Sequence, residues 1–227
     1  MGYVQSKLKK FDLLYANGCS FVQGSELNGL ALGNRPYSKI NNRFTEIISE
    51  KVNIPYINDA IGGSGNDKII RRTYEFIKDK SSKKVIVVLG LSGLDRYEIW
   101  SPIYDEYLKF NLSHYEDDST PLMDMMGTYI KYFHDKHKQI EKLHRELTML
   151  QAYIKSVNND NELIVFSSLC NGIEHFKDDF NYIMFDEFST WNDYNRKHKS
   201  EYKGGHPNEE SHHMLSEKII KIIEKKT

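Results

Sequence analysis

The stretch LLYANGCSF, residues 13–21, decides the fold expected for this chain. A short apolar run is followed by Gly18 and then, two positions later, by the hydroxyl of Ser20. An apolar run bounded by turn residues is typical of a buried strand. In an open parallel sheet, ligands bind beyond the carboxyl ends of the strands. The stretch therefore places Ser20 where a functional group is expected, although a serine after a glycine is also a common turn residue or helix cap.

The rest of the chain alternates between predicted strands and helices. Apolar runs at 55–57, 85–91 and 163–166 predict strands, and the last two are continuous enough to be buried on both faces. Apolar residues recur with helical spacing at 40–52, 67–80 and 208–225. This alternation predicts an α/β fold in which helices cover both faces of a parallel sheet.

Two segments do not follow this alternation. Residues 100–120 are aromatic, acidic and irregular, and 122–157 reads as one long helix with charges on its outer side. We interpret 100–157 as a helical insertion, a lid or an oligomer contact, in a single domain that spans 1–227. The aromatic-rich stretch 176–202 has little periodicity and predicts a long loop near the site.

The composition argues against nucleic-acid or membrane partners, a disulfide framework and a membrane-spanning segment. Lysine and arginine number 31 against 32 aspartates and glutamates, so no global field favours nucleic acid or an anionic membrane. Cys19 and Cys170 lie far apart and form no CxxC pair, which indicates neither a disulfide framework nor a zinc site. No apolar stretch resembles a membrane span or a signal peptide. We expect a soluble cytoplasmic protein.

Three further stretches carry residues suited to chemistry. NDAIGGSGNDKIIRRT (58–73) follows the second predicted strand, and its glycines allow backbone amides to approach a ligand. LGLSGLDRYEIW (89–100) ends the third strand, and GGHPNEESHHM (204–214) sets His206 just before the last helix. A doubly wound fold would bring Ser20, both loops and His206 to one edge of the sheet.

These blocks resemble the SGNH/GDSL hydrolase family in order, spacing and local chemistry. GCSF with GSEL, NDAIGGSGNDKIIRRT, SGLDRYE and HPNEESH look like the branch often found in tailed-phage genomes. The resemblance runs from Gly18 to the last helix and is weakest at 100–161. It implies a three-layer α/β/α, flavodoxin-like fold with sheet order 2-1-3-4-5. It also implies hydrolysis of a small-molecule or carbohydrate ester, O-deacetylation for instance, without a cofactor.

The resemblance makes Ser20 the nucleophile and His206 its general base, with the amides of Ser20 and Gly62 in the oxyanion hole. The family's asparagine in the third block is replaced here by Ser92. Asn66, in the second block, is an alternative amide donor or else a helix cap. Arg96 either recognises a carboxylate or phosphate of the substrate or forms a loop salt bridge.

The aspartate that the family places three residues before the histidine is replaced by Lys203. Three explanations remain open: a Ser–His dyad oriented by a backbone carbonyl, a replacement acid such as Glu201 or Asp186, or a fold kept without turnover. The last corresponds to a non-catalytic phage structural or glycan-binding protein, for instance in a virion. The histidines of HDKH (134–137) and His212–His213 lack a metal-ligand motif such as HExxH, so no metal is expected.

Overall fold

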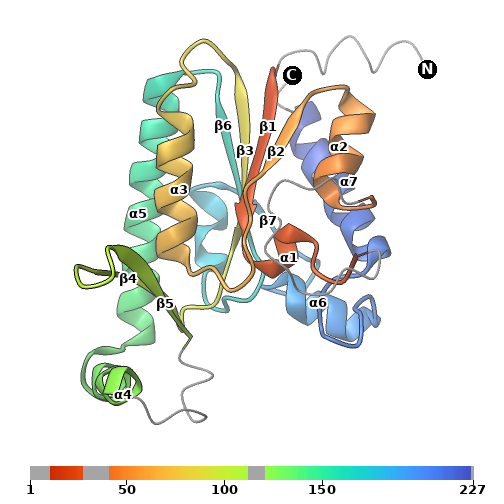
Figure 1. The fold of residues 1–227 in the computed structure, drawn as a ribbon. Coiled ribbons are helices and arrows are strands. Elements are labelled where there is room, and N and C mark those ends of the chain that lie inside the picture. Colours follow the sequence, from red (N-terminus) through yellow and green to blue (C-terminus); the bar gives the residue numbers. More distant parts are fainter. Residues whose placement is uncertain (1–10, 28–40, 112–120, 226–227) are drawn as a thin grey trace.

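A computed structural model of the chain describes residues 11–27, 41–111 and 121–225. In this part, five parallel strands form a sheet in the order β2-β1-β3-β6-β7 (Figure 1). The strands are β1 (Leu13–Gly18), β2 (Tyr56–Asn58), β3 (Val85–Leu91), β6 (Glu162–Ser167) and β7 (Asn181–Ile183). Numbered among themselves, they have the order 2-1-3-4-5. The predicted α/β fold and strand order are confirmed.

Helices cover both faces of this sheet, as Figure 1 shows. On one face lie α2 (Phe44–Val52) and α7 (Glu209–Lys225), and on the other lie α3 (Asn66–Ile77) and α5 (Lys136–Val157). Alternate residues of each strand enter different cores. Leu14 and Ala16 pack with the α2–α7 side, and Leu13 and Tyr15 pack with the α3–α5 side. Because both faces of the central strands are buried, nearly every residue in them is apolar, which explains the continuous apolar runs in the sequence.

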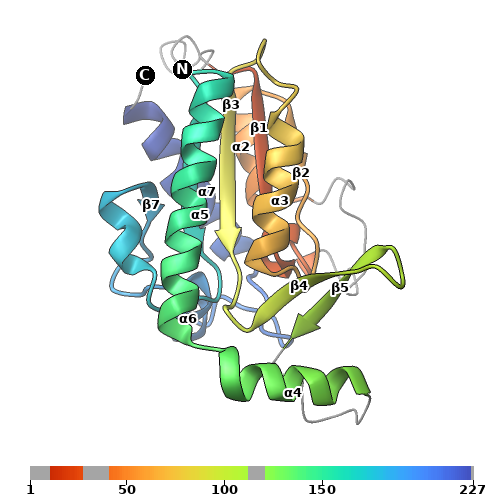
Figure 2. The ribbon, with the colours of Figure 1, turned by 90° about the vertical axis from the view of Figure 1, so that its left-hand side faces the viewer.

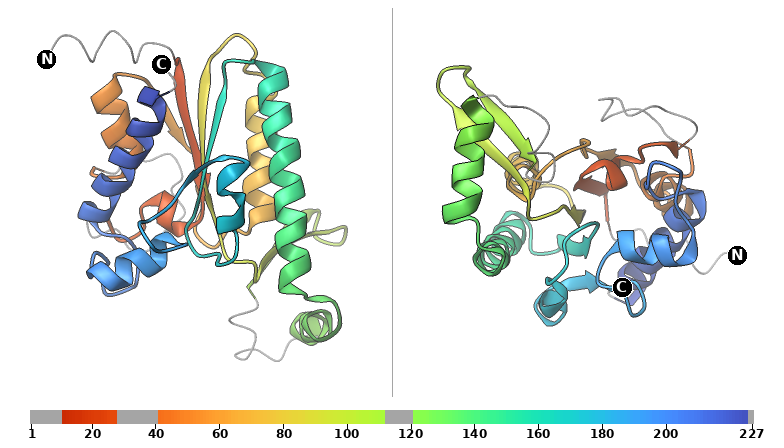
Figure 3. Two further views of the ribbon diagram at one scale, coloured as in Figure 1. Left: turned by 180° about the vertical axis from the view of Figure 1, so that it is seen from behind. Right: turned by 90° about the horizontal axis from the view of Figure 1, so that it is seen from below.

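The central strands end together at the carboxyl edge, where Gly18 of β1 pairs with Gly90 of β3. The short helix α1 (Ser20–Gln23) starts directly after β1 and packs onto these two ends (Figure 3). A Cβ atom on Gly18 would lie 2.4 Å from Val22, and one on Gly90 would lie 2.3 Å from it. Both positions therefore require glycine, because any side chain would push α1 away from the sheet.

The segment 100–157 differs from its prediction in two ways. Its irregular first part forms an antiparallel hairpin of β4 (Arg96–Ser101) and β5 (Glu106–Asn111), while 112–120 lies outside the described residues. The single helix predicted over 122–157 is two helices, α4 (Pro121–Phe133) and α5. Asp135 separates them because its carboxylate accepts a hydrogen bond from the amide of Lys138, 3.1 Å away, and caps α5.

Only part of this segment lies outside the layers of the fold. In α5, Leu143, Leu147, Leu150 and Ile154 are buried against the sheet, so α5 is one of the covering helices. The hairpin lies beside the start of α3, and α4 projects beyond the carboxyl edge (Figure 2). The segment that departs from the layered fold is therefore the hairpin together with α4.

The stretch 176–202 was predicted to be a loop, but much of it is ordered secondary structure. It contains β7, most of the 3-10 turn η4 (Glu174–Asp178) and α6 (Trp191–His198). Each of these elements is short, so hydrophobic periodicity is not visible in the sequence. Tertiary packing defines them instead, with Trp191 fully buried and Thr190 capping α6 by accepting from the amide of Asp193.

The other predicted helices, 40–52, 67–80 and 208–225, correspond to α2, α3 and α7. α2 begins only at Phe44 and α3 ends already at Ile77, and residue 40 lies outside the described residues. In the described part of the chain, no helix combines the length and the apolar character needed to cross a membrane.

His212 of α7 is completely buried between aromatic rings. Its ring stacks on Phe44 and meets Trp191 edge-on, and its Nδ1 accepts a hydrogen bond from the amide of Phe44 at 3.4 Å. Burial, with smaller effects from Arg43 and His213, lowers the pKa of His212 from 6.5 to about 3. His212 is therefore neutral in the folded protein at neutral pH.

This burial predicts acid sensitivity. Between pH 6.5 and about 3 the unfolded chain binds a proton at His212 that the folded protein does not. The stabilising contribution of neutral His212 is complete above pH 6.5 and falls as the pH falls, by up to about 1.4 kcal/mol per pH unit. Urea unfolding of wild type and His212→Phe at several pH values measures this. The free energy of unfolding of the variant minus that of wild type, taken relative to its value at pH 7.5, should rise steadily as the pH falls from 6.5 to 4. Parallel stability curves would contradict this.

Candidate active site

Ser20 is the first residue of α1, at the carboxyl end of β1. Its carbonyl oxygen accepts hydrogen bonds from the amides of Gly24 and Ser25, both at 3.1 Å. Gly24 has a φ of +79°, in the left-handed region that favours glycine. The chain thus turns tightly after Ser20 and reaches Glu26 within six residues. Cys19, beside Ser20, is buried in the core.

His206 lies on the loop before α7 and contacts this same turn. Its Nδ1 is 2.9 Å from Oε2 of Glu26, and its ring centroid is 5.6 Å from that of Phe21. Because an ionised carboxylate only accepts hydrogen bonds, this contact assigns the ring proton to Nδ1 and leaves Nε2 as the acceptor nitrogen. The pair is partly shielded from water, with the His206 side chain 14% and that of Glu26 28% exposed.

The backbone on both sides of the pair is specialised for this contact. Glu26 has a φ of +70°, which is uncommon for a residue with a side chain and often marks a functional position. A Cβ atom on Gly204 would lie 2.2 Å from Oε1 of Glu26, so a side chain at this position would displace the carboxylate. Gly204 and the exposed Lys203 are the central residues of a turn closed by a hydrogen bond from the amide of Gly205 to the carbonyl of Tyr202, at 2.9 Å.

The two carboxylates predicted as replacement acids lie elsewhere. Asp186 accepts a hydrogen bond from Nζ of Lys218 at 3.0 Å. Glu201 pairs through its backbone with Pro207, and its Oε2 is buried without a hydrogen-bond partner in the described structure. Among the described residues, neither carboxylate hydrogen-bonds to His206. Sequence reasoning missed Glu26 because it considered only carboxylates close to the histidine, whereas Glu26 is 180 positions away.

Ser20 and His206 reach the same edge of the sheet, but no hydrogen bond between Ser20 Oγ and the His206 ring occurs among the described residues. Contacts of His206 with Phe21 and Glu26 bring it to the turn that Ser20 begins. Catalytic hydrogen bonds are often long in ligand-free proteins and tighten when substrate binds. The direct Ser20–His206 contact therefore stays a prediction.

Gly62 lies next to Ser20, as an oxyanion donor requires. A Cβ atom on Gly62 would be 3.8 Å from Cβ of Ser20, and the amide of the preceding Ile61 donates to the carbonyl of Gly18 at 3.2 Å. The amide of Gly62 itself donates to Oε1 of Gln23 at 3.0 Å. An amide oxygen of the protein itself thus accepts from this donor.

The other predicted binding residues form one polar chain between α3 and the end of β3. Nδ2 of Asn66 donates to the carbonyl of Ser92 at 3.0 Å, and the amide of Ser92 donates to Oδ1 of Asn66 at 2.8 Å. Ser92 is fully buried, and its Oγ accepts from Nη1 of Arg96 at 3.1 Å. Asn66 follows the N-cap residue Gly65, so its side chain holds the β3 loop instead of capping α3.

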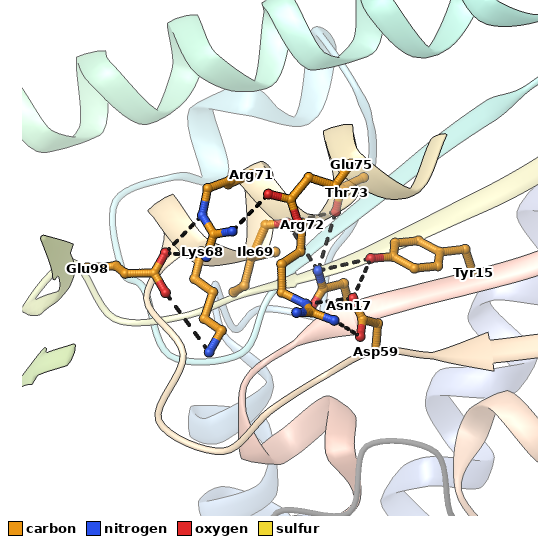
Figure 4. A network of polar contacts seen from close by, with 10 residues as sticks. All are labelled: Tyr15, Asn17, Asp59, Lys68, Ile69, Arg71, Arg72, Thr73, Glu75 and Glu98. Carbon is orange, nitrogen blue, oxygen red and sulfur yellow. Dashed lines mark hydrogen bonds and ion pairs between the residues drawn. The ribbon is translucent and has the colours of Figure 1, made fainter. Parts of the chain in front are cut away.

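A buried network fixes the carboxyl edge on which these groups lie (Figure 4). Oδ1 of Asn17 accepts from the amide of Gly18 at 2.8 Å, and its Nδ2 donates to the hydroxyl of Tyr15 and to the carbonyl of Ile69. The hydroxyl of Tyr15 donates to Asp59 at 3.0 Å. Burial, followed by the charge of Asp59, raises the pKa of Tyr15, so its phenol remains a donor. The network joins β1, the residue after β2, and α3.

No metal cluster accompanies this site: within the described ranges, no three His, Cys, Asp or Glu side chains are arranged to hold a metal ion. Of the histidines considered in the sequence, His134 contacts the hydroxyl of Tyr97 at 2.6 Å. His137 is an exposed residue 3.4 Å from Glu141.

Comparison with known proteins identifies the fold. No protein-family model and no curated protein sequence matches this chain. Among solved structures, an acetyl xylan esterase from the rumen bacterium Butyrivibrio proteoclasticus has a TM-score of 0.55 at 12% identity, over 95% of this chain and 64% of that one. An acetyl-xylooligosaccharide esterase from Geobacillus has a TM-score of 0.52 at 11% identity, over 93% of this chain and 94% of that one.

A psychrotrophic esterase from a Pseudoalteromonas species has a TM-score of 0.51 at 13% identity, over 94% of this chain and 97% of that one. At such identities the similarity establishes the fold alone. The chain therefore shares a three-layer α/β/α fold with these esterases, and the fold class predicted from the sequence is confirmed.

The buried network predicts a specific stability loss. Asp59→Ala removes the carboxylate that Arg72 and Tyr15 contact in the interior, where Arg72 Nε donates to Asp59 Oδ2 at 2.8 Å. Because the buried Tyr15 hydroxyl then loses its acceptor and the partly buried Arg72 loses an ionic partner, we expect the free energy of unfolding to fall by about 2 kcal/mol. Urea unfolding measures this change. Glu141→Ala, which breaks an exposed ion pair with Lys138, should leave the midpoint unchanged, and equal losses would refute the assignment.

Proposed function

We propose that the protein is a serine-dependent ester hydrolase in which Ser20 is the nucleophile, His206 the general base and Glu26 the acid that orients His206. The observation that carries this proposal is the hydrogen bond between His206 Nδ1 and Glu26. It supplies the acceptor that Lys203 cannot provide at the usual position of the acid. A serine, a histidine and a carboxylate at one sheet edge have the roles of a catalytic triad, which is recognised by geometry and not by chain order.

In the proposed reaction, Ser20 Oγ attacks the ester carbonyl carbon while His206 Nε2 accepts the hydroxyl proton. Glu26 keeps the other ring proton on Nδ1 and stabilises the imidazolium that forms. Collapse of the tetrahedral intermediate breaks the ester C–O bond, and the alcohol leaves with the proton from Nε2. Water, deprotonated by His206, then attacks the acyl-enzyme, which releases the carboxylic acid and regenerates Ser20.

The oxyanion of the intermediate needs donors, and the amides of Ser20 and Gly62 are the proposed pair. A single such donor is worth about 3 kcal/mol in other enzymes. The Gly62 amide donates to Gln23, so the substrate carbonyl has to displace the Gln23 side chain. Ser92 and Asn66 are engaged with each other and with Arg96, which supports a role in holding the loop near the substrate.

For the substrate we propose a small-molecule or carbohydrate ester, with acetyl as the acyl group and without a cofactor. The fold is shared with two enzymes named as esterases of acetylated xylan or xylooligosaccharides, which supports this class of substrate. The sequence motifs resemble those of tailed-phage proteins. We therefore also propose that the protein is encoded by a phage and is located in the host cytoplasm or in the virion.

One observation favours a different function. Gly62, the second proposed oxyanion donor, is occupied by Gln23, as expected for a cleft that binds without catalysing. The alternative is therefore a non-catalytic glycan-binding or phage structural protein that retains the fold. Measurable release of acetate would exclude it.

Removing the nucleophile tests the proposal directly. Ser20→Ala should reduce turnover of p-nitrophenyl acetate by at least about 10³-fold and abolish covalent labelling by a fluorophosphonate probe. Cys19→Ser, which alters the buried neighbouring thiol, is the matched control and should remain labelled. Equal turnover and labelling by wild type and Ser20→Ala would remove Ser20 from the mechanism.

The role of Glu26 is tested by an isosteric change. Glu26→Gln keeps the side-chain shape but removes the charge, so kcat should fall by about 10³-fold with little change in KM. Glu201→Gln and Asp186→Asn serve as controls and should retain activity close to wild type, because neither carboxylate contacts His206. A loss with either control and none with Glu26→Gln would assign the acid to the other residue.

A further inference from the structure

An open pocket of about 460 Å³ lies outside the candidate active site and is lined by residues of α3, α5 and the β4–β5 hairpin. Tyr74, Tyr107 and Met149 provide apolar surface, and Asp67, Glu75, Glu98 and Glu146 provide carboxylates. The proposed reaction does not use this pocket. Its volume is in the range of small-ligand sites.

The aromatic surface of the pocket is accessible. Tyr107 is 39% exposed, and its neighbour Trp100, whose ring centroid lies 5.1 Å away, is 46% exposed. Met149, on the facing helix α5, is 61% exposed. The guanidinium of Arg71 lies over the Tyr107 ring, with Cζ 4.1 Å from its centroid, and this contact holds the ring in place. Fixed, exposed aromatic surface in a concave site suits a ligand with an apolar face.

The carboxylates of the pocket are largely neutralised by cations of the protein itself. Glu98 accepts from Arg71 at 2.8 Å and lies 4.0 Å from Nζ of Lys68, as Figure 4 shows. Asp67 pairs with Lys142 at 2.7 Å, and Lys142 also lies 3.7 Å from Glu146. Glu75, the fourth carboxylate, accepts from Arg71 at 2.9 Å. Four carboxylates thus face three cations, Arg71, Lys68 and Lys142, so the pocket offers many donors and acceptors and only a small net charge. Such a surface favours a neutral hydrogen-bonding ligand over a free cation or anion.

We propose that this pocket binds a neutral carbohydrate unit. A pyranose ring has a face of C–H groups, which would lie against Tyr107 and Met149, and a rim of hydroxyls, which would bond to Glu75, Glu146 and Arg71. Asp67 is the residue after Asn66 in α3, so the pocket adjoins the polar chain at the carboxyl edge. Seen from below in Figure 3, the hairpin and α1 both lie at this edge. The site does not depend on catalysis by Ser20.

Binding is measured by NMR titration of the Ser20→Ala protein, so ester cleavage plays no part. The probes are xylohexaose, cellohexaose, maltohexaose and chitohexaose, each up to about 10 mM. At least one should shift amide resonances of α3, α5 and the hairpin, with the same affinity in 50 and 500 mM NaCl. Shifts by none of the four would overturn the proposal. So would tighter, salt-sensitive binding of spermidine at these amides, which would assign the pocket to cations.

Variants locate the binding. Tyr107→Ala should weaken it by at least about 10-fold, which corresponds to about 1.4 kcal/mol. Met149→Arg, at an exposed position that tolerates a longer side chain, should obstruct the pocket and abolish the shifts. Tyr132→Ala changes a 66% exposed tyrosine on α4 that does not line the pocket, and it should leave affinity unchanged. Unchanged affinity in both pocket variants would overturn the proposal, whereas turnover of p-nitrophenyl acetate is tested independently.

Discussion

The contact on which the rest of this structure depends is the packing of α1 onto the ends of β1 and β3. Gly18 and Gly90 are paired in register, and both leave room for Val22 where a Cβ would collide with it. This close approach starts α1 at Ser20, turns the chain at Gly24 and delivers Glu26 to the loop before α7. A larger residue at either glycine would displace the serine and the carboxylate together.

Glu26 belongs to the same turn of the chain as Ser20, and this has a chemical consequence. In the proposed triad, the acid comes from the segment that begins with Ser20 and not from the segment that carries His206. Lys203 can then occupy the usual position of the acid, where it lies exposed in a turn. Two local features permit this arrangement. Glu26 adopts a strained backbone conformation with positive φ, and Gly204 leaves room for the Glu26 carboxylate.

The long and regular strands and helices could be predicted from the sequence, because their hydrophobic patterns are local. The apolar run at 85–91 and the helical spacing in 67–80 were sufficient for the parallel sheet and for α3, since both elements are long and regular. The three-residue strand β7 and the Glu26–His206 pair could not be predicted in this way, because tertiary contacts alone define them. The break before α5 did have a local signal, because Asp135 is a good N-cap residue. It was missed because the surrounding residues, HDKH, are also compatible with the middle of a charged helix.

The most direct test of the central claim is a crystal structure of the protein after reaction with a fluorophosphonate. The account predicts phosphorus bonded to Ser20 Oγ, with His206 Nε2 within hydrogen-bond distance of the adduct and Nδ1 still on Glu26. It also predicts a phosphonyl oxygen on the amide of Gly62, in the place of Gln23 Oε1. An unmodified Ser20, or an adduct from which the His206 ring is separated by packed side chains, would contradict it.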